Sequence, residues 1–179
     1  RMAQFALAAT VVMGAFIALN QLRVSAVAPV AVATIAKSVG PVYLLGERAE
    51  LRPTDGLDAV TAGQTIVTGD GAGLALAWGN GGSVRIDAHT RVRFDDGESV
   101  FVEEGRVYFD SHASQVAGIT AGDSPRLTMR TPHGELHHLG TQYMAEVVRD
   151  ALVVSVREGE VAVDGRFHQQ TVVAGQQAT

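Results

Sequence analysis

The sequence contains no cysteine, which excludes a disulfide framework, a thiol nucleophile and a cysteine-based zinc site. It also has little positive charge. Only three of the 14 Lys and Arg residues precede Glu47, and the other 11 are arginines, which stand against 19 acids between residues 47 and 179. Binding to nucleic acid needs clustered basic residues, because counterion release from the phosphates drives the affinity. These arginines alternate with acids, so the sequence predicts no nucleic-acid partner.

Charge is absent from one long stretch near the N-terminus. Phe5 to Leu19 has no charged residue, and the apolar run from Ala3 to Leu22 would form a helix of about 30 Å, the thickness of a bilayer's hydrocarbon core. The first residue is Arg1. We expect residues 1–23 to be a transmembrane helix that anchors the chain in a membrane.

Two alternatives for this segment remain open. A secretory signal peptide would also have a basic start and an apolar stretch, and Ala26 and Ala28 imitate a cleavage site. A buried core helix is the other alternative, although such a helix normally has a polar face. The uncharged stretch that follows contains Pro29, which interrupts a helix, so residues 24–33 are expected to form a juxtamembrane tether.

From Thr34 onward the sequence has recurrent glycines and apolar residues that alternate with polar ones, which is typical of β-strands. Residues 34–179 are therefore expected to form one all-β domain of stacked short strands and hairpins, as a sandwich or a short solenoid-like fold. Residues 141–158 also fit helical spacing. The β-branched run Val153 to Val156 favours two strands there, with a turn at Arg149-Asp150.

A weak internal repeat supports the strand prediction. Val102 to Asp110 matches Val156 to Asp164 in the order Val, any residue, Glu, Gly, any residue, Val, any residue, apolar residue, Asp. Gly82 to Asp87 is a shorter echo of it. We interpret each copy as a strand, a glycine-containing turn and a second strand, which would bury its apolar face by stacking on its neighbours.

Three histidines are the best candidates for chemistry. His133, His137 and His138 lie within six residues, but alternate residues of a strand point to opposite faces, so only two of the three would meet one ion. Glu135 would have to complete a zinc site, which needs three or four ligands. Solvent-exposed histidines on a polar strand face are the favoured interpretation, and no metal or other cofactor is expected.

No catalytic motif is present either. The glycine-rich segment Gly69 to Gly73 lacks the lysine and the following helix of a phosphate loop, which favours a turn. The acid pairs Asp95-Asp96 and Glu103-Glu104 are adjacent in sequence, and neighbours on a strand face opposite ways, so they are poor acid–base pairs. The sequence predicts a protein that is not an enzyme.

The order and spacing of short motifs resemble a known family. The series runs from Ala62-Gly63-Gln64 through the strand around Val84, the Gly105 motif and the Gly140-Thr141 motif to Ala174-Gly175-Gln176. It is similar to the FecR family of transmembrane sigma-factor regulators, specifically to the extracytoplasmic β domain, over about residues 34–177. The residues that match the family's motifs, all expected to be structural, are Gly82, Val84, Gly105, Val107, Tyr108, Phe109, Gly140, Thr141, Tyr143, Gly159 and Val161.

The resemblance implies a single-pass inner-membrane protein of a Gram-negative bacterium, with most of the chain in the periplasm. It implies a sigma factor bound by a cytoplasmic segment that would precede Arg1. It also implies a signal from a TonB-dependent outer-membrane receptor of the iron-uptake type, followed by proteolysis near the membrane. In this family a small mixed α/β domain often follows the β domain, and residues 34–179 are expected to hold the β domain without it.

The residues depart from the family pattern in two places. Tyr143 stands where the family usually has Phe, and its hydroxyl needs a partner or a water. His137 and His138 stand where the family is more often aliphatic, so we expect that strand to be more exposed here. Gly140 is expected to provide a backbone angle that other residues avoid, and Thr141 to bond a nearby backbone group.

Two other classes of function stay open from the sequence alone. The first is an exported structural or envelope-binding β domain that is unrelated to sigma regulation. The other is an enzyme such as a small lyase or metallohydrolase, which would need a cluster of acids or histidines in a groove.

Overall fold

The computed structural model describes residues 30–79, 81–111, 127–165 and 169–179, and these residues form fourteen β-strands. Within those ranges no helix is long and apolar enough to cross a membrane. The transmembrane helix expected for residues 1–23 lies outside the described residues, as does most of the tether. The strands are β1 (Ala31–Val39), β2 (Val42–Leu45), β3 (Leu51–Pro53), β4 (Ala59–Thr61), β5 (Thr65–Thr68), β6 (Gly73–Trp78), β7 (Ser83–Ile86), β8 (Arg91–Phe94), β9 (Ser99–Asp110), β10 (Thr128–Thr131), β11 (Gly134–Val148), β12 (Ala151–Gly165), β13 (Gln169–Val173) and β14 (Gln177–Ala178).

The predicted start of the domain needs one correction. Strand β1 begins at Ala31, three residues before the boundary expected at Thr34, and pairs with β4 and β6. Val32 and Ala33 are buried in the core. Residues 31–33 have no charge and no periodic pattern, which is why the sequence predicts a tether there. They form a strand because they are buried beside two neighbouring strands, β4 and β6.

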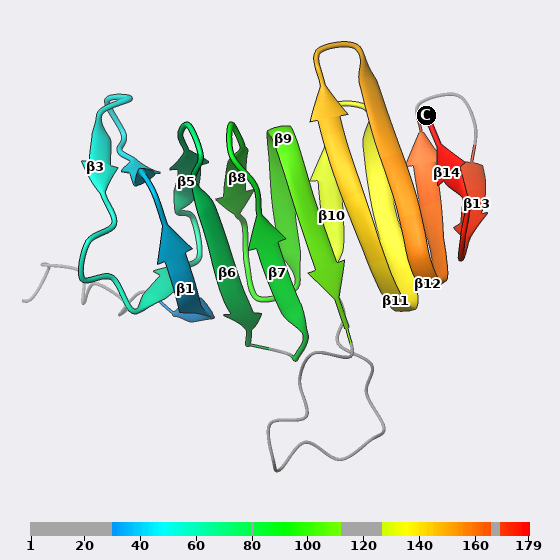
Figure 1. The fold of residues 1–179 in the computed structure, drawn as a ribbon, viewed down its shortest axis with the longest axis horizontal. Coiled ribbons are helices and arrows are strands. Elements are labelled where there is room, and N and C mark those ends of the chain that lie inside the picture. Colours follow the sequence, from blue (N-terminus) through cyan, green and yellow to red (C-terminus); the bar gives the residue numbers. More distant parts are fainter. Residues whose placement is uncertain (1–29, 80, 112–126, 166–168) are drawn as a thin grey trace, which may run out of the picture.

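The hydrogen-bonded strands form two layers that lie face to face (Figure 1). One layer is built on β4, β1, β6 and β7, and the other on β3, β2, β5 and β8. The long strands β9, β11 and β12 take part in both. The first half of β9 pairs with β8 and β10, whereas its second half pairs with β7 and β11. The all-β prediction is confirmed for the described residues, and the chain winds between the layers much as a short solenoid would.

One hydrophobic core fills the space between the layers. The predicted alternation places Leu74, Leu76, Val84 and Ile86 inward, each at most 2% exposed, while residues between them face outward. Burying an aliphatic side chain of this size stabilises the fold by about 1.5–3 kcal/mol. The two faces of the sandwich are therefore held together mainly by these inward rows.

Strands β9 and β12 share a bend that changes the phase of the alternation. In β9 the inward residues Val102 and Val107 are five positions apart, with exposed Glu103 and Glu104 between them. Gly105 lies in this bend with a φ of 93°. The internal repeat is thus real, but the Glu-Gly element is a bend inside one continuous strand and not the turn of a hairpin.

The same device recurs in β12, where the inward residues Val156 and Val161 are again five apart. Gly159 lies between them with a φ of 76°. Strand β11 bends at Gly140, whose φ is 59°. The prediction that Gly140 supplies an angle that other residues avoid is confirmed, since side chains rarely tolerate this left-handed region.

Two further predictions are confirmed by the strands. Residues 141–158 form two strands, β11 and β12, and the chain turns between them at Arg149-Asp150. The glycine-rich segment after Thr68 is the turn that joins β5 to β6.

We predict that Gly105→Ala destabilises the domain far more than Gly140→Ala. A Cβ at position 105 would lie 2.5 Å from Thr90 Cα and 2.6 Å from the His89 carbonyl oxygen, whereas a Cβ at position 140 meets nothing within 4 Å. Gly140→Ala should cost about 1 kcal/mol from backbone strain alone. Gly105→Ala should cost about 3 kcal/mol or more, because backbone must move. Urea unfolding of both variants checks this, and equal losses would contradict the role given to Thr90.

Candidate functional site

The three histidines that were the candidate metal ligands point to different places. The Nε2 atom of His133 lies 3.1 Å from the Val148 carbonyl oxygen. His137 lies 3.6 Å from the carboxylate of Asp164. His138 is directed into the domain. Among the residues that the structure describes, no three His, Asp or Glu side chains are placed to hold a metal ion.

The acid pairs hold arginines. Asp95 accepts hydrogen bonds at 2.6 Å from both Arg93 and Arg130. Glu103 and Glu104 approach the same Arg91 Nε, at 3.3 and 3.7 Å. The sequence-based expectation that these two neighbours face opposite ways is wrong, because they sit in the bend of β9. All of these groups are better suited to fixing strand ends than to proton transfer.

The residues of the family motifs gather in the core and at the bends. Val84, Val107, Phe109, Tyr143 and Val161 are all fully buried. Tyr108 faces outward, and the Arg85 guanidinium lies 5.5 Å from the centre of its ring. Gly82 is packed closely, since a Cβ at this position would lie 2.9 Å from the Asp110 carbonyl oxygen. The bends hold Gly105, Gly140, Thr141 and Gly159. The motif therefore marks the framework that joins the layers.

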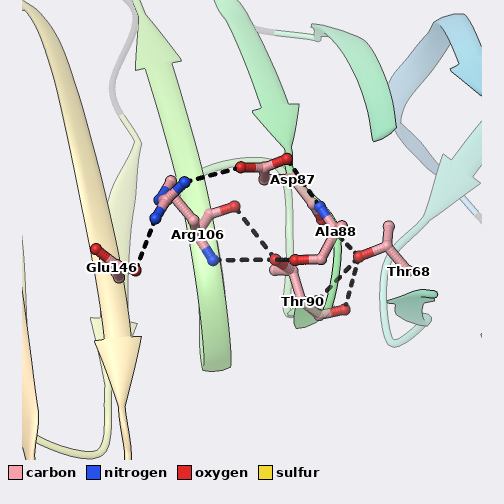
Figure 2. A network of polar contacts seen from close by, with 6 residues as sticks. All are labelled: Thr68, Asp87, Ala88, Thr90, Arg106 and Glu146. Carbon is pink, nitrogen blue, oxygen red and sulfur yellow. Dashed lines mark hydrogen bonds and ion pairs between the residues drawn. The ribbon is translucent and has the colours of Figure 1, made fainter. Parts of the chain in front are cut away.

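A buried threonine network secures the bend of β9 (Figure 2). The Thr90 hydroxyl accepts the Arg106 N–H at 2.9 Å and lies 3.2 and 3.3 Å from the carbonyl oxygens of Ala88 and Arg106. The Thr68 hydroxyl accepts the Thr90 N–H at 2.9 Å and donates to the Asp87 carbonyl at 2.6 Å. Backbone groups that the bend would leave unpaired are thus satisfied by two side chains, which explains why β5, β7 and β9 meet at this point.

The outer surface of the same region holds an ion-pair network. Arg106 lies 3.1 Å from Asp87 and 2.8 Å from Glu146, so it connects the end of β7, β9 and β11 (Figure 2). The hydrogen bond and charge of Glu146, followed by those of Asp87, raise the pKa of Arg106. The Arg106 side chain is 46% exposed, so solvent screens both ion pairs.

We predict that the buried and exposed parts of this network contribute unequally. Thr90→Val removes the acceptor of the Arg106 N–H and should cost about 2 kcal/mol, because a buried donor is left unpaired. Arg106→Met should cost less than about 1 kcal/mol, the usual range for exposed ion pairs. Thermal unfolding of the two variants measures both. A larger loss for Arg106→Met would show that the surface charges hold the bend.

An aromatic cluster lies where β9 and β11 pair. The ring centres of Phe109 and His138 are 4.6 Å apart, and those of Phe109 and Tyr143 are 5.9 Å apart. The expectation that the His137-His138 strand is more exposed is wrong for His138, whose ring packs on Phe109. Burial raises the pKa of Tyr143, and its hydroxyl has no hydrogen-bond partner among the described residues.

The prediction that the Thr141 hydroxyl bonds a nearby backbone group is wrong. Its Oγ1 is buried and has no hydrogen-bond partner among the described residues. Ser111 performs that role: its Oγ accepts the Thr141 N–H at 2.8 Å and donates to the Thr141 carbonyl at 3.1 Å. Thr141 instead places its methyl group beside Gly159. A Cβ on residue 159 would lie 2.7 Å from this methyl group. Ser111 carries no motif signal in the sequence, so sequence reasoning missed it.

His138 is held as a neutral ring. Its Nε2 accepts the Leu127 N–H at 3.0 Å, which places the ring proton on Nδ1. Burial, and next the charge of His137, lowers the pKa of His138 from 6.5 to about 4. Between pH 6.5 and pH 4, His138 therefore binds a proton in the unfolded chain but not in the folded chain. The stabilisation is complete above pH 6.5 and is lost as the pH falls towards 4.

We predict that His138→Leu flattens the dependence of stability on pH. Between pH 7 and pH 4.5 the unchanged protein should lose on the order of 1–2 kcal/mol through His138, less than a fully buried ring would give. Urea unfolding at several pH values measures the slope, and His137→Leu should reduce it only slightly, because the charge of His137 is the smaller cause of the lowered pKa of His138. An unaltered slope in His138→Leu would contradict the assignment.

Several buried hydroxyls in the described residues serve the backbone. Those of Thr54, Thr68, Ser111 and Thr131 donate to main-chain carbonyl groups, and none of them is paired with a histidine or carboxylate. A shallow hollow of about 190 Å³ on the outer face is lined by residues that include Arg91, Arg93 and Phe101, with the arginines already paired to acids.

Comparison with known proteins agrees with this architecture. A solved structure from Parabacteroides distasonis ATCC 8503, described as a candidate anti-sigma factor, matches with a TM-score of 0.51 and 21% identity. The match covers 63% of this chain and 52% of that protein, so the chain spans about half the length of the protein it resembles. A second crystal structure with the same description has a TM-score of 0.49, with the same identity and coverage. At this identity the likeness shows the fold alone.

A search of curated proteins found no match. The profile of the family described as FecR protein matches residues 64–162, more than half of the chain. The matched range includes the three glycine bends, the Thr90 network and the aromatic cluster. This chain belongs to the FecR family.

Proposed function

We propose that this chain regulates an extracytoplasmic-function sigma factor from the inner membrane. The observation that carries the proposal is the FecR family match over residues 64–162. The similar solved structure is itself described as a candidate anti-sigma factor, which supports the same role. In this arrangement the β domain is in the periplasm, residues 1–23 cross the membrane, and the sigma factor is bound on the cytoplasmic side.

The signal in this proposal comes from a TonB-dependent outer-membrane receptor of the iron-uptake type. The β domain acts as a receiver and not as an enzyme. Support for a binding role comes from the side chains themselves, since the carboxylates of Asp95, Glu103 and Glu146 are paired with arginines and the buried hydroxyls of Thr68 and Ser111 with backbone. A rigid body joined through β9, β11 and β12 would pass a contact on one layer to the other layer and to the chain entering at β1.

Deletion of the β domain tests the proposal. Removing residues 34–179 from the protein in its native bacterium should change transcription of the genes that depend on the neighbouring sigma factor by several-fold, because the sigma factor loses its regulated partner. A reporter fused to one such promoter measures this, in cells with and without an iron chelate.

Two variants separate loss of signal from loss of fold. Gly105→Ala should imitate the deletion if the folded domain is needed, and Gly140→Ala should behave like the unchanged protein. Unchanged reporter output in the deletion strain would instead favour an exported structural or envelope-binding domain. A reporter that responds to the deletion but not to any iron chelate would remove the iron-uptake receptor and keep sigma regulation.

A further inference from the structure

The sandwich is open at the end formed by its last strands. A pocket of about 290 Å³ lies there between the tip of the β11–β12 hairpin, β13 and β14. Its floor is apolar and includes Leu152, Val154 and Val163, which belong to the core or pack against it. Asp150 and Gln170 belong to its polar rim. This pocket lies at the end of the sandwich that holds β13, β14 and the C-terminus, the strands drawn in red in Figure 1.

Strand β13 forms the edge of one layer beside this pocket. It pairs with β12 through five residues, Gln169–Val173, and no charged residue or proline lies within it. The other three edges in the described part of the chain are guarded. Strand β3 contains Arg52 and Pro53, β4 has three residues and pairs irregularly with β1, and β14 has two residues. Charge, proline and short length are the usual protection of an edge against strand addition, and β13 has none of these.

A second copy of the chain is a poor occupant of this edge. Five residues bury far less than the roughly 1,200 Å² of a stable interface between two folded proteins. Val172 points inward and is 1% exposed in its own core, so a second β13 could not place it in the neighbouring pocket. A short extended peptide fits better, because such a peptide uses backbone pairing and one anchor side chain.

The charges near β13 indicate the chemistry of such a peptide. Glu160 is opposite Val173, and Asp164, whose carboxylate lies 3.6 Å from His137, is opposite Gln169, so a carboxylate stands at each end of the strand. Asp150 lies at the pocket itself. A peptide with an apolar centre and basic ends would complement this pattern.

We propose that β13 accepts an extended segment of another protein as an added strand, with an aliphatic side chain seated in the adjoining pocket. The added strand extends the β12–β13 layer, its backbone gives the affinity, and the pocket selects the residue at its centre. This site does not depend on sigma regulation and stands or fails by itself.

The probes are nine-residue peptides, acetylated and amidated, which alternate threonine with valine between terminal lysines and have leucine, alanine or aspartate at the centre. The full 179-residue chain is held in lipid nanodiscs, and binding is followed by fluorescence anisotropy and hydrogen exchange. The leucine peptide should bind about tenfold more tightly than the alanine peptide, the ratio expected for burying the larger side chain. It should also slow exchange at those amides of Gln169–Val173 that point away from β12.

Filling the pocket provides the matched test. Ala178 lines the pocket on β14, so Ala178→Leu should remove the preference for leucine over alanine. Ala62→Leu is the control, because Ala62 is exposed in the turn before β5 and far from this edge in the strand order. Both variants should keep the melting temperature of the unchanged chain.

Several outcomes would overturn the proposal. The site is wrong if no peptide binds at millimolar concentration, or if leucine, alanine and aspartate peptides bind equally. Slow exchange in the free chain at every concentration, at those amides of Gln169–Val173 that point away from β12, would show that another segment of the same chain covers the edge. Protection that rises with protein concentration without peptide would assign the edge to a second copy.

Discussion

The packing of the Thr90 backbone against Gly105 is the constraint on which the two-layer structure depends. At this point β9 leaves one layer and enters the other, and a Cβ on residue 105 would collide with Thr90 and with the His89 carbonyl oxygen. The absence of a side chain lets the two backbones approach, and the Thr90 hydroxyl then satisfies the Arg106 N–H that the bend exposes. This contact therefore lets one continuous strand take part in both layers.

Strands β11 and β12 contain similar glycine bends. Gly159 in β12 meets the Gly140 carbonyl and the Thr141 methyl, so the bends of β11 and β12 are packed against each other as β9 is packed against Thr90. Apolar rows on both sides of the bends then fill one core. The bends and the shared core thus join the two layers along β9, β11 and β12.

Most strands of this domain could be predicted from the sequence, because alternation of apolar and polar residues reports directly which face is buried. The bends could not. Glu104-Gly105 and Glu158-Gly159 have the composition of a hairpin turn, and only the partner strands on either side show that the chain continues in the same direction. The burial of His138 depends on Phe109, which is distant in sequence, and the role of Ser111 at Thr141 depends on the pairing of β9 with β11. Contacts between distant residues leave no local pattern.

Native-state hydrogen exchange of β9 tests the central claim most directly, which is that the glycine bends make both layers a single cooperative unit. The amides of Val100 and Val102 belong to one layer, and those of Val107 and Phe109 to the other. A common opening free energy for all four, equal to that of global unfolding, is the predicted result. Two separate opening free energies, one for each half of β9, would contradict it and show that the layers move independently.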